Sequence, residues 1–251
     1  MRLLLVFLKE PIPGKVKTRL AKDVGEDTAA LYYKAIVEVL LKQLRGLENC
    51  RIRFCFTPDD AEEAIRFWLL PEMGATSSDT KGLYVAPVFT SKQLDHQEID
   101  FRAQGQGDLG ERVNNAFTEG FTDGYSSIIV IGSDCPACGA RWLNTAFPRL
   151  ESKPSSEGII GPSHDGGYYL LGLKSPAPFL FEDISWSCKH VLAATHTAAK
   201  NNQFTLTQLP PLGDVDHLDD WNALLASPLG AAVKKMLEKN FGGNGAASLA
   251  T

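Results

Sequence analysis

A basic stretch follows the first apolar run of the sequence and is the part best suited to bind an anion. Four cations share it with one acid, Glu10: Lys9, Lys15, Lys17 and Arg19. Two prolines and a glycine shape it, so that backbone N–H groups near Gly14 can add to the cationic side chains. Because the whole chain has a net charge of −5, this positive charge is local. It predicts a phosphate-bearing small ligand rather than a nucleic-acid surface, which would need a broad basic face.

Known phosphate-binding motifs do not account for this stretch. A Walker A loop that ends at Gly14-Lys15 would need Gly where Lys9 stands and Ser or Thr where Val16 stands. The dinucleotide pattern G-x-G-x-x-G is also absent. A looser phosphate-binding loop remains, with a solvated basic turn as the alternative interpretation.

Acidic side chains follow later apolar runs. Asp134 comes after the most apolar one, residues 127–131, where a carboxylate can hold a divalent cation that bridges phosphates. Asp214 and Asp216 could add ligands, although Asp216 is equally well placed to cap a helix. Asp165 offers an acceptor for ligand hydroxyl groups.

Glycines and aromatic residues surround two of these acidic positions. Gly166 and Gly167 allow a ligand to approach the backbone closely, and Tyr168 could pack against a ring; a hairpin turn is the compatible structural interpretation. A second acidic group combines possible helix capping with possible sugar or acceptor contacts: Asp108, Glu111 and Arg112.

Alternating strand and helix patterns position these groups. Apolar runs predict strands at residues 3–8, 51–56, 83–89, 127–131, 158–160, 168–173 and 203–209. Helical spacing predicts helices at residues 29–47, 58–69, 110–120, 141–150, 187–201 and 216–225. Residues 71–82 are predicted to form a loop and the polar residues 90–107 a mobile loop. The pattern favours one domain over residues 1–240, with a flexible tail at 241–251, built on a mostly parallel sheet with helices on both faces.

Composition excludes several classes of function. A pI near 5.6 argues against general binding to nucleic acid or anionic membranes. The first apolar run is too short to span a bilayer and lacks a small-residue cleavage site, so it is interpreted as a strand. The odd number of scattered cysteines predicts reduced thiols and a cytoplasmic protein. A redox pair at Cys135 and Cys138 is the weaker alternative to incidental thiols.

Six motifs in order resemble a known family. They are Phe7-Leu8-Lys9-x-Pro11-x-Pro13-Gly14-x-Val16-Lys17-Thr18-Arg19-Leu20, Gly107-Asp108-Leu109-Gly110-Glu111-Arg112, Ile131-Gly132-Ser133-Asp134-Cys135-Pro136, Gly161-Pro162-x-x-Asp165-Gly166-Gly167-Tyr168-Tyr169-Leu170-Leu171-Gly172-Leu173, Ile184-x-Trp186-Ser187 and Asp214-Val215-Asp216. Together they resemble the uncharacterised bacterial GT-A-type glycosyltransferases, which are close to the nucleotidyltransferases of cofactor biosynthesis. The resemblance spans residues 3 to about 225.

The resemblance implies a GT-A, nucleotide-diphospho-sugar transferase fold with a nucleotide at the first strand-loop. It places a divalent metal, Mg²⁺ or Mn²⁺, on Asp134, with Asp216 matching a late metal ligand. Asp134-Cys135-Pro136 lacks the second acid of the Asp-x-Asp motif of other GT-A proteins. Two further departures lie beside the proposed acids: Ala-Cys-Gly follows Pro136, and His-Leu-Asp-Asp-Trp follows Asp216.

These patterns lead to predicted roles for individual residues. Asp134 and Asp165 are the candidate catalytic residues, and Asp134 and Asp216 the candidate metal ligands. Candidate nucleotide-binding residues are Lys9, Pro13, Gly14, Lys15, Lys17, Thr18, Arg19 and Ser133. Candidate substrate-binding residues are Asp108, Glu111, Arg112, Gly166, Gly167, Tyr168 and Trp186.

The leading prediction is a metal-dependent transferase that moves a sugar from a nucleotide-diphosphate sugar to a small-molecule acceptor. The alternative is a nucleotidyltransferase, in which a substrate phosphate attacks an NTP and pyrophosphate leaves. A nucleotide-binding module without catalysis and a thiol redox protein are further alternatives. No nucleic-acid partner and no membrane span are expected.

Overall fold

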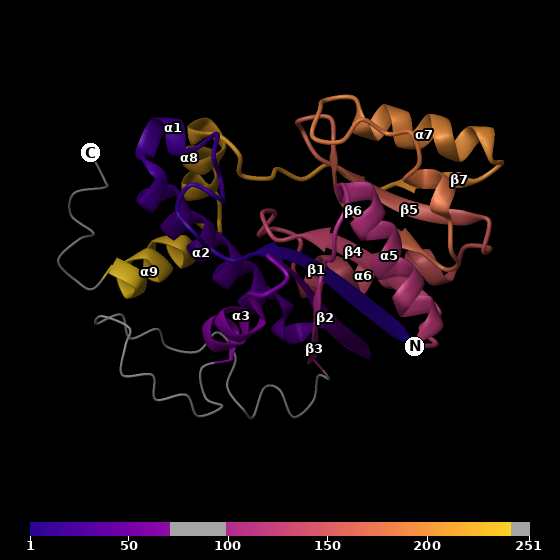
Figure 1. Ribbon diagram of the computed structural model, residues 1–251, viewed down its shortest axis with the longest axis horizontal. Helices are drawn as coiled ribbons and strands as arrows, with labels where there is room; N and C mark the ends of the chain where they lie inside the picture. Colours follow the sequence, from indigo (N-terminus) through magenta and orange to yellow (C-terminus); the bar gives the residue numbers. More distant parts are fainter. Residues whose placement is uncertain (71–98, 242–251) are drawn as a thin grey trace.

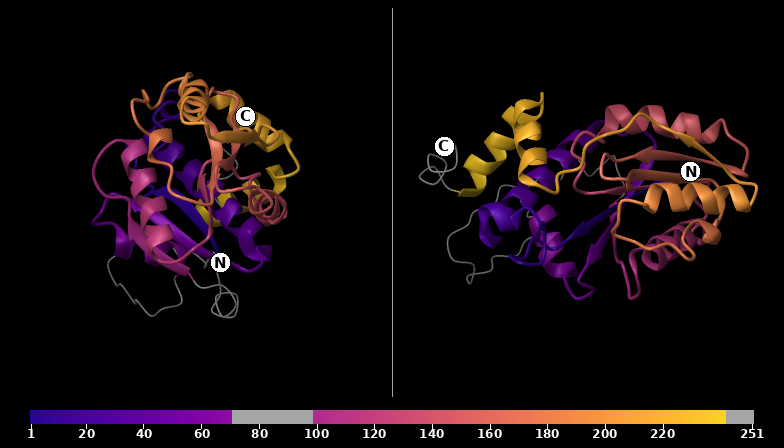
Figure 2. Two further views of the ribbon diagram at one scale, coloured as in Figure 1. Left: turned by 90° about the vertical axis from the view of Figure 1, so that its right-hand side faces the viewer. Right: turned by 90° about the horizontal axis from the view of Figure 1, so that it is seen from above.

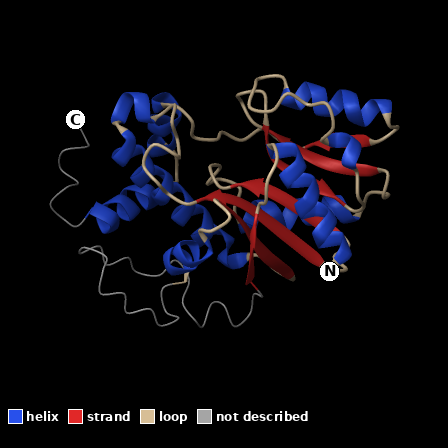
Figure 3. Ribbon diagram, viewed as in Figure 1, coloured by secondary structure: helices blue, strands red, loops and turns tan. Residues whose placement is uncertain are grey.

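A seven-stranded sheet forms the centre of the protein in a computed structural model that describes residues 1–70 and 99–241 (Figures 1 and 3). In spatial order the strands are β3 (Ile99–Ala103), β2 (Cys50–Thr57), β1 (Arg2–Lys9), β4 (Ser127–Gly132), β6 (Tyr168–Leu173), β5 (Glu157–Pro162) and β7 (Thr205–Gln208). Strand β6 runs antiparallel to β4 and β5, whereas the other pairings are parallel. The predicted α/β class with a mostly parallel sheet is therefore confirmed.

Helices cover both faces of this sheet. The described α-helices are α1 (Ala21–Val24), α2 (Glu26–Gln43), α3 (Glu62–Leu69), α5 (Leu109–Thr122), α6 (Ala140–Glu151), α7 (Val191–Asn201), α8 (Leu218–Ala226) and α9 (Gly230–Phe241). Two short 3₁₀ turns, η1 (Leu44–Gly46) and η2 (Pro178–Leu180), complete the described elements. Among these residues, each helix is too short or too polar to span a bilayer.

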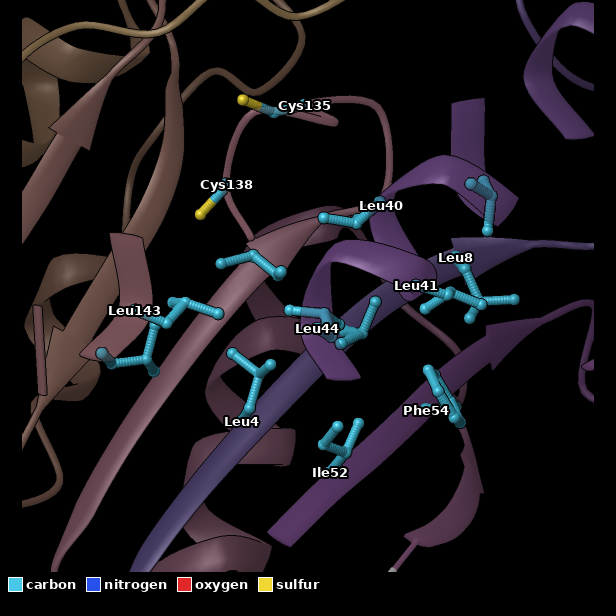
Figure 4. Packing of buried hydrophobic residues seen from close by; sticks show 14 of the residues in the cluster. Leu4, Leu8, Leu40, Leu41, Leu44, Ile52, Phe54, Cys135, Cys138 and Leu143 are labelled. Atoms are coloured by element: carbon cyan, nitrogen blue, oxygen red, sulfur yellow. The ribbon is translucent and has the colours of Figure 1, made fainter. Parts of the chain in front are cut away.

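The alternation of β1 explains the two-sided core. Leu4 and Leu8 are buried on the face that packs against leucines of α2 (Figure 4). Leu3 and Leu5 are buried on the opposite face, with Phe117 of α5. A strand that is apolar on both faces belongs at the centre of a parallel sheet. The carboxyl end of β1 is thereby fixed at the middle of the sheet edge.

A third layer of helices lies outside α2. The outer face of α2 packs against α8 and α9, where Tyr32 stacks on Trp221 with ring centroids 3.8 Å apart. To reach α8, the chain from β7 crosses the molecule (Figures 1 and 2). This crossing segment carries Asp214 and Asp216, so packing at α8 positions acids that lie far from β1 in sequence.

The structure corrects the predicted boundaries in several places. Strand β3 lies within the polar stretch expected to be a loop, because its charges are paired: Asp100 accepts from the buried Arg53 at 2.8 Å, and Arg102 donates to Glu119 at 2.7 Å. Helix α7 begins at Val191 rather than at residue 187. The predicted loop at 71–82, the predicted strand at 83–89, residues 90–98 of the predicted mobile loop and most of the predicted tail lie outside the described residues.

Candidate active site

The candidate site lies where several strands end at one edge of the sheet. Lys9 ends β1, and its register partner on β2 is Thr57; Phe7 of β1 pairs with Gly132 at the end of β4. The segments that follow β4, β5 and β7 lie at the same edge, as does the beginning of the antiparallel β6. Ligands of open α/β sheets bind outside this edge, at the point where the strand order reverses, which here lies between the parallel strands β1 and β4.

Lys17 joins two of these segments. Its Nζ donates to Asp134 Oδ2 at 2.9 Å and to Asp216 Oδ1 at 2.8 Å. Its side chain is only 5% exposed, and its backbone adopts a left-handed φ of 45°. Burial alone would lower the pKa of Lys17, but the two carboxylates outweigh it and hold this pKa above its ordinary value. The cation predicted to bind phosphate is therefore a partner of the two predicted metal ligands.

Backbone contacts tie the segments after β4 and β7 to each other. Val215 N donates to the carbonyl of Asp134 at 3.2 Å. The preceding residue, Ser133, is buried, and its hydroxyl is 2.9 Å from that of Tyr33, which accepts from Lys9 N at 2.8 Å. Burial raises the pKa of Tyr33 to about 12. Ser133 thus forms the support behind Asp134, and it does not line the cavity described below.

Asp216 is available to Lys17 because another residue caps α8. The N-cap is His217, and Asp220 Oδ2 accepts from the backbone N–H groups of Asp216 and His217 at 3.0 and 2.8 Å. The alternative that Asp216 caps the helix is therefore wrong. Its second oxygen accepts from Arg19 at 3.0 Å. Burial would raise the pKa of Asp216, but the two cations outweigh it and lower this pKa below its ordinary value.

Three carboxylates converge beside this ion-paired group. Asp165, Asp214 and Asp216 each present an oxygen, and these oxygens lie within 4.8 Å of one another. Asp165 Oδ1 accepts from the Ser163 hydroxyl and, at 2.9 Å, from Gly167 N, an arrangement that closes the β5–β6 turn. Burial raises the pKa of Asp214 to about 7, with Asp134 and Asp165 contributing.

A cavity of about 510 Å³ opens beside these acids. Its described lining comes from strand ends, from the beginnings of α5 and α7, and from the segments that follow β4, β5, β6 and β7. It comprises Phe7, Lys9, Arg19, Leu109, Val113, Val130, Ile131, Gly132, Asp134, Ser163, Asp165, Gly167, Tyr168, Tyr169, Leu170, Trp186, Ser187, Cys188, Lys189, Val191, Asp214 and Asp216.

Two aromatic residues that line the cavity, Tyr168 and Trp186, form what we call its aromatic wall. The Tyr168 and Trp186 rings meet edge to face, with centroids 6.5 Å apart. The indole lies so close to Gly110, at the beginning of α5, that any side chain there would collide with it. The position of Trp186 therefore depends on a glycine from a distant element.

Several predicted site residues lie at the cavity and others do not. Those that line it are Lys9, Arg19, Asp134, Asp165, Gly167, Tyr168, Trp186 and Asp216. Those outside its lining are Pro13, Gly14, Lys15, Lys17, Thr18, Ser133, Asp108, Glu111, Arg112 and Gly166. The ligand roles assigned to both groups remain predictions.

Local structure explains some of the excluded residues. Asp108 and Glu111 form a reciprocal capping box at the beginning of α5. Arg112 donates to the Asp108 carbonyl at 3.1 Å and to Gln104 Oε1 at 2.9 Å. Gly166 lies against the Lys189 backbone. Helix capping, hydrogen bonds within the protein and backbone packing therefore account for these residue types without a ligand.

The structure decides which candidates meet and also brings in residues that sequence patterns do not select. Asp214, a candidate ligand beside Asp216, joins the carboxylates through the chain that crosses from β7 to α8. Leu109, Val113, Ser187 and Lys189 join the cavity because α5 and α7 begin there. No local signal distinguishes the apolar positions Leu109 and Val113 from core positions.

The thiol pair does not have the character of a redox site. Cys135 and Cys138 are both buried, in the loop after β4 (Figure 4). Burial raises the pKa of Cys135 to about 12 and that of Cys138 well above its ordinary value. Reactive thiols need a depressed pKa and some exposure. Both sulfurs belong to the apolar core instead.

Comparison with known proteins agrees with this fold. The fold is that of the nucleotide-diphospho-sugar transferases: a crystal structure from Desulfovibrio desulfuricans G20, provisionally named as such a transferase, matches with a TM-score of 0.73 and 29% identity over 95% of this chain and 97% of that one. Residues 40–188, more than half of the chain, match the family described as "Uncharacterized protein conserved in bacteria (DUF2064)". The chain belongs to that family.

More distant structures include nucleotidyltransferases. A cytidylyltransferase from Leptospira borgpetersenii has a TM-score of 0.46 at 13% identity, over 89% of this chain and 84% of that one. A 4-diphosphocytidyl-2C-methyl-D-erythritol synthase has a TM-score of 0.45 at 12% identity, over 94% and 98%. No curated protein gives a significant match.

Proposed function

We propose that this protein is a metal-dependent transferase that moves a sugar from a nucleotide-diphosphate sugar to a small-molecule acceptor. One observation carries the proposal: a cavity at the carboxyl edge of the sheet combines cations from the first loop, converging carboxylates and an aromatic wall. This combination suits a donor diphosphate at the cationic side and an acceptor at the aromatic side.

The cations that face the cavity would bind the diphosphate. Lys9 and Arg19 line it, and Lys15 is exposed on the same loop. Arg19 donates to Asp216 through one nitrogen, which leaves its other guanidinium N–H groups for phosphate oxygens. Positive charge here would stabilise the nucleoside diphosphate as it leaves.

The donor set fits a hard divalent cation. Carboxylate oxygens are the ligands that Mg²⁺ and Mn²⁺ prefer, and the oxygens of Asp165, Asp214 and Asp216 lie close enough to share one ion. Asp134 would join them as the predicted strand-end ligand. When bound, such an ion supplies charge neutralisation for the diphosphate.

Asp165 is the candidate for contact with the acceptor hydroxyl. Asp165 lines the cavity, and the two described hydrogen bonds to its carboxylate both use Oδ1, which leaves Oδ2 for a further partner. A carboxylate held in this way can accept the proton of an attacking hydroxyl. Tyr168 and Trp186 would hold the body of the acceptor.

The alternative is nucleotidyl transfer from an NTP. The basic loop supports it, since three phosphates need more positive charge than two. Against it, two of the four cations of this basic stretch, Lys9 and Arg19, line the cavity, whereas Lys15 and Lys17 lie outside its described lining. This charge balance favours a diphosphate donor.

Product analysis tests the choice between these reactions. The purified protein is incubated with Mn²⁺ or Mg²⁺, a panel of nucleotide sugars and NTPs, and pooled small-molecule acceptors. We expect acceptor-dependent release of a nucleoside diphosphate. Release of pyrophosphate from an NTP would refute glycosyl transfer and establish the alternative. Ligand-induced stabilisation without turnover, unchanged in Asp134→Asn, would indicate a binding module instead.

A further inference from the structure

Lys17 occupies the position between the two acids that the sequence assigns to a metal. Its Nζ contacts one oxygen of Asp134 and one of Asp216, at 2.9 and 2.8 Å. Arg19 takes the second oxygen of Asp216 at 3.0 Å. Both Asp216 oxygens are therefore engaged by cations, and a metal ion that bridges Asp134 and Asp216 would compete with these cations for the carboxylates.

The surroundings of Lys17 make this contact a specific one. Its side chain is 5% exposed, whereas the Arg19 side chain is 47% exposed. Its backbone carbonyl accepts from Ala21 N at 2.8 Å, so the loop has an anchor that does not depend on the ion pairs of the side chain. An ammonium ion and a divalent cation compete for the same carboxylate oxygens, because both are held there by charge.

We propose that Lys17 is an internal counter-ion that a divalent metal must displace from Asp134 and Asp216. When displaced, its ammonium group becomes available to the donor diphosphate, which the same metal neutralises. Metal binding and release of a phosphate-binding cation are thereby coupled at one edge of the sheet. This inference rests on the metal dependence in the proposed function.

Metal binding to the nucleotide-free protein tests the proposal. Mn²⁺ is titrated by electron paramagnetic resonance into wild type, Lys17→Met, Lys17→Gln and Lys15→Met. Because removal of the competing cation leaves two carboxylates without their partner, we expect Lys17→Met to bind Mn²⁺ at least about tenfold more tightly than wild type. Lys15 is exposed on the same loop, so Lys15→Met controls for the loss of one positive charge and should differ by about twofold or less.

A second measurement uses the wild-type protein and so does not depend on the folding of a variant. Reductive methylation followed by peptide mass spectrometry reports which lysines are accessible. We expect Lys17 to be protected without metal and modified with Mn²⁺, whereas the exposed Lys15 is modified in both conditions.

The outcomes separate this inference from the proposed function. Equal Mn²⁺ affinity in wild type and both Lys17 variants, or protection of Lys17 at saturating Mn²⁺, would overturn the inference alone. Absence of Mn²⁺ binding from every protein would overturn both the inference and the metal dependence.

Discussion

The candidate site has two ends. An aspartate lies at each end, and the two aspartates are in opposite electrostatic settings. At the ion-paired end, Asp216 lies between Lys17 and Arg19, and its pKa is lowered. At the acidic end, Asp214 is near other carboxylates, and its pKa is raised to about 7. These two acids are separated by one residue. The comparison teaches that burial favours a raised pKa for both acids, and that cations from the distant first loop reverse this effect for Asp216 but not for Asp214.

The largest expected effect comes from the ion-paired end. Asp134→Asn removes a charge that the proposal assigns to the metal, so we expect the turnover rate to fall by about a hundredfold or more. Nucleoside diphosphate release measures it, with the exposed Asp23→Asn as a matched control. Unchanged turnover would mean that the acidic end carries the reaction without Asp134.

Removing the cation of the ion-paired end should destabilise the fold. Lys17→Met leaves two carboxylates without their partner, and we expect the free energy of unfolding to fall by about 1–3 kcal/mol. Urea denaturation measures this loss, and Mn²⁺ should restore part of it. Lys15→Met should change stability by about 0.5 kcal/mol or less. Equal effects of the two substitutions would contradict the specific role of Lys17.

A substitution at the acidic end should raise the free energy of unfolding, and the size of this gain should depend on pH. Because the pKa of Asp214 is raised to about 7 in the folded protein, its protonated form is favoured there. Wild-type stability from this group is present below an unfolded pKa of about 3.9 and is lost as pH rises through the folded pKa. Asn at this position cannot ionise, so the stability of Asp214→Asn should not show this loss as pH rises.

Thermal or urea unfolding of Asp214→Asn at several pH values checks this expectation. The variant should gain about 1 kcal/mol relative to wild type at pH 8, once solvent screening of this partly exposed group is allowed for. The difference should shrink toward pH 4. A constant difference at all pH values would show that the mutation acts through packing.

The smallest expected effect comes from the aromatic wall. Trp186→Phe keeps an aromatic ring but reduces the surface offered to an acceptor. We expect the acceptor KM to rise by about two- to fivefold with kcat little changed, the sign of lost uniform binding. Initial-rate kinetics measure it. A fall in kcat alone would place Trp186 with the reacting groups instead.

Local patterns were sufficient for the framework of the protein. The apolar runs predicted β1, β4 and β6 close to their observed bounds because a buried strand shows its burial in consecutive residues. Strand β3 was missed because Asp100 and Arg102 make it polar, and their partners lie on β2 and α5. The sequence pattern of one segment cannot show that its charged side chains are paired with residues of another segment.

The candidate site is likewise predicted in part by local residue types and decided in part by tertiary contacts. Residue types alone predicted an anion-binding loop and acids at the strand ends, since buried strands end where charged residues begin. Tertiary structure decided which charges meet: Lys17 contacts acids 117 and 199 positions away. The capping box of His217 and Asp220 leaves the Asp216 side chain free for this contact. Electrostatic partnership depends on distance in space, and the crossing from β7 to α8 sets that distance.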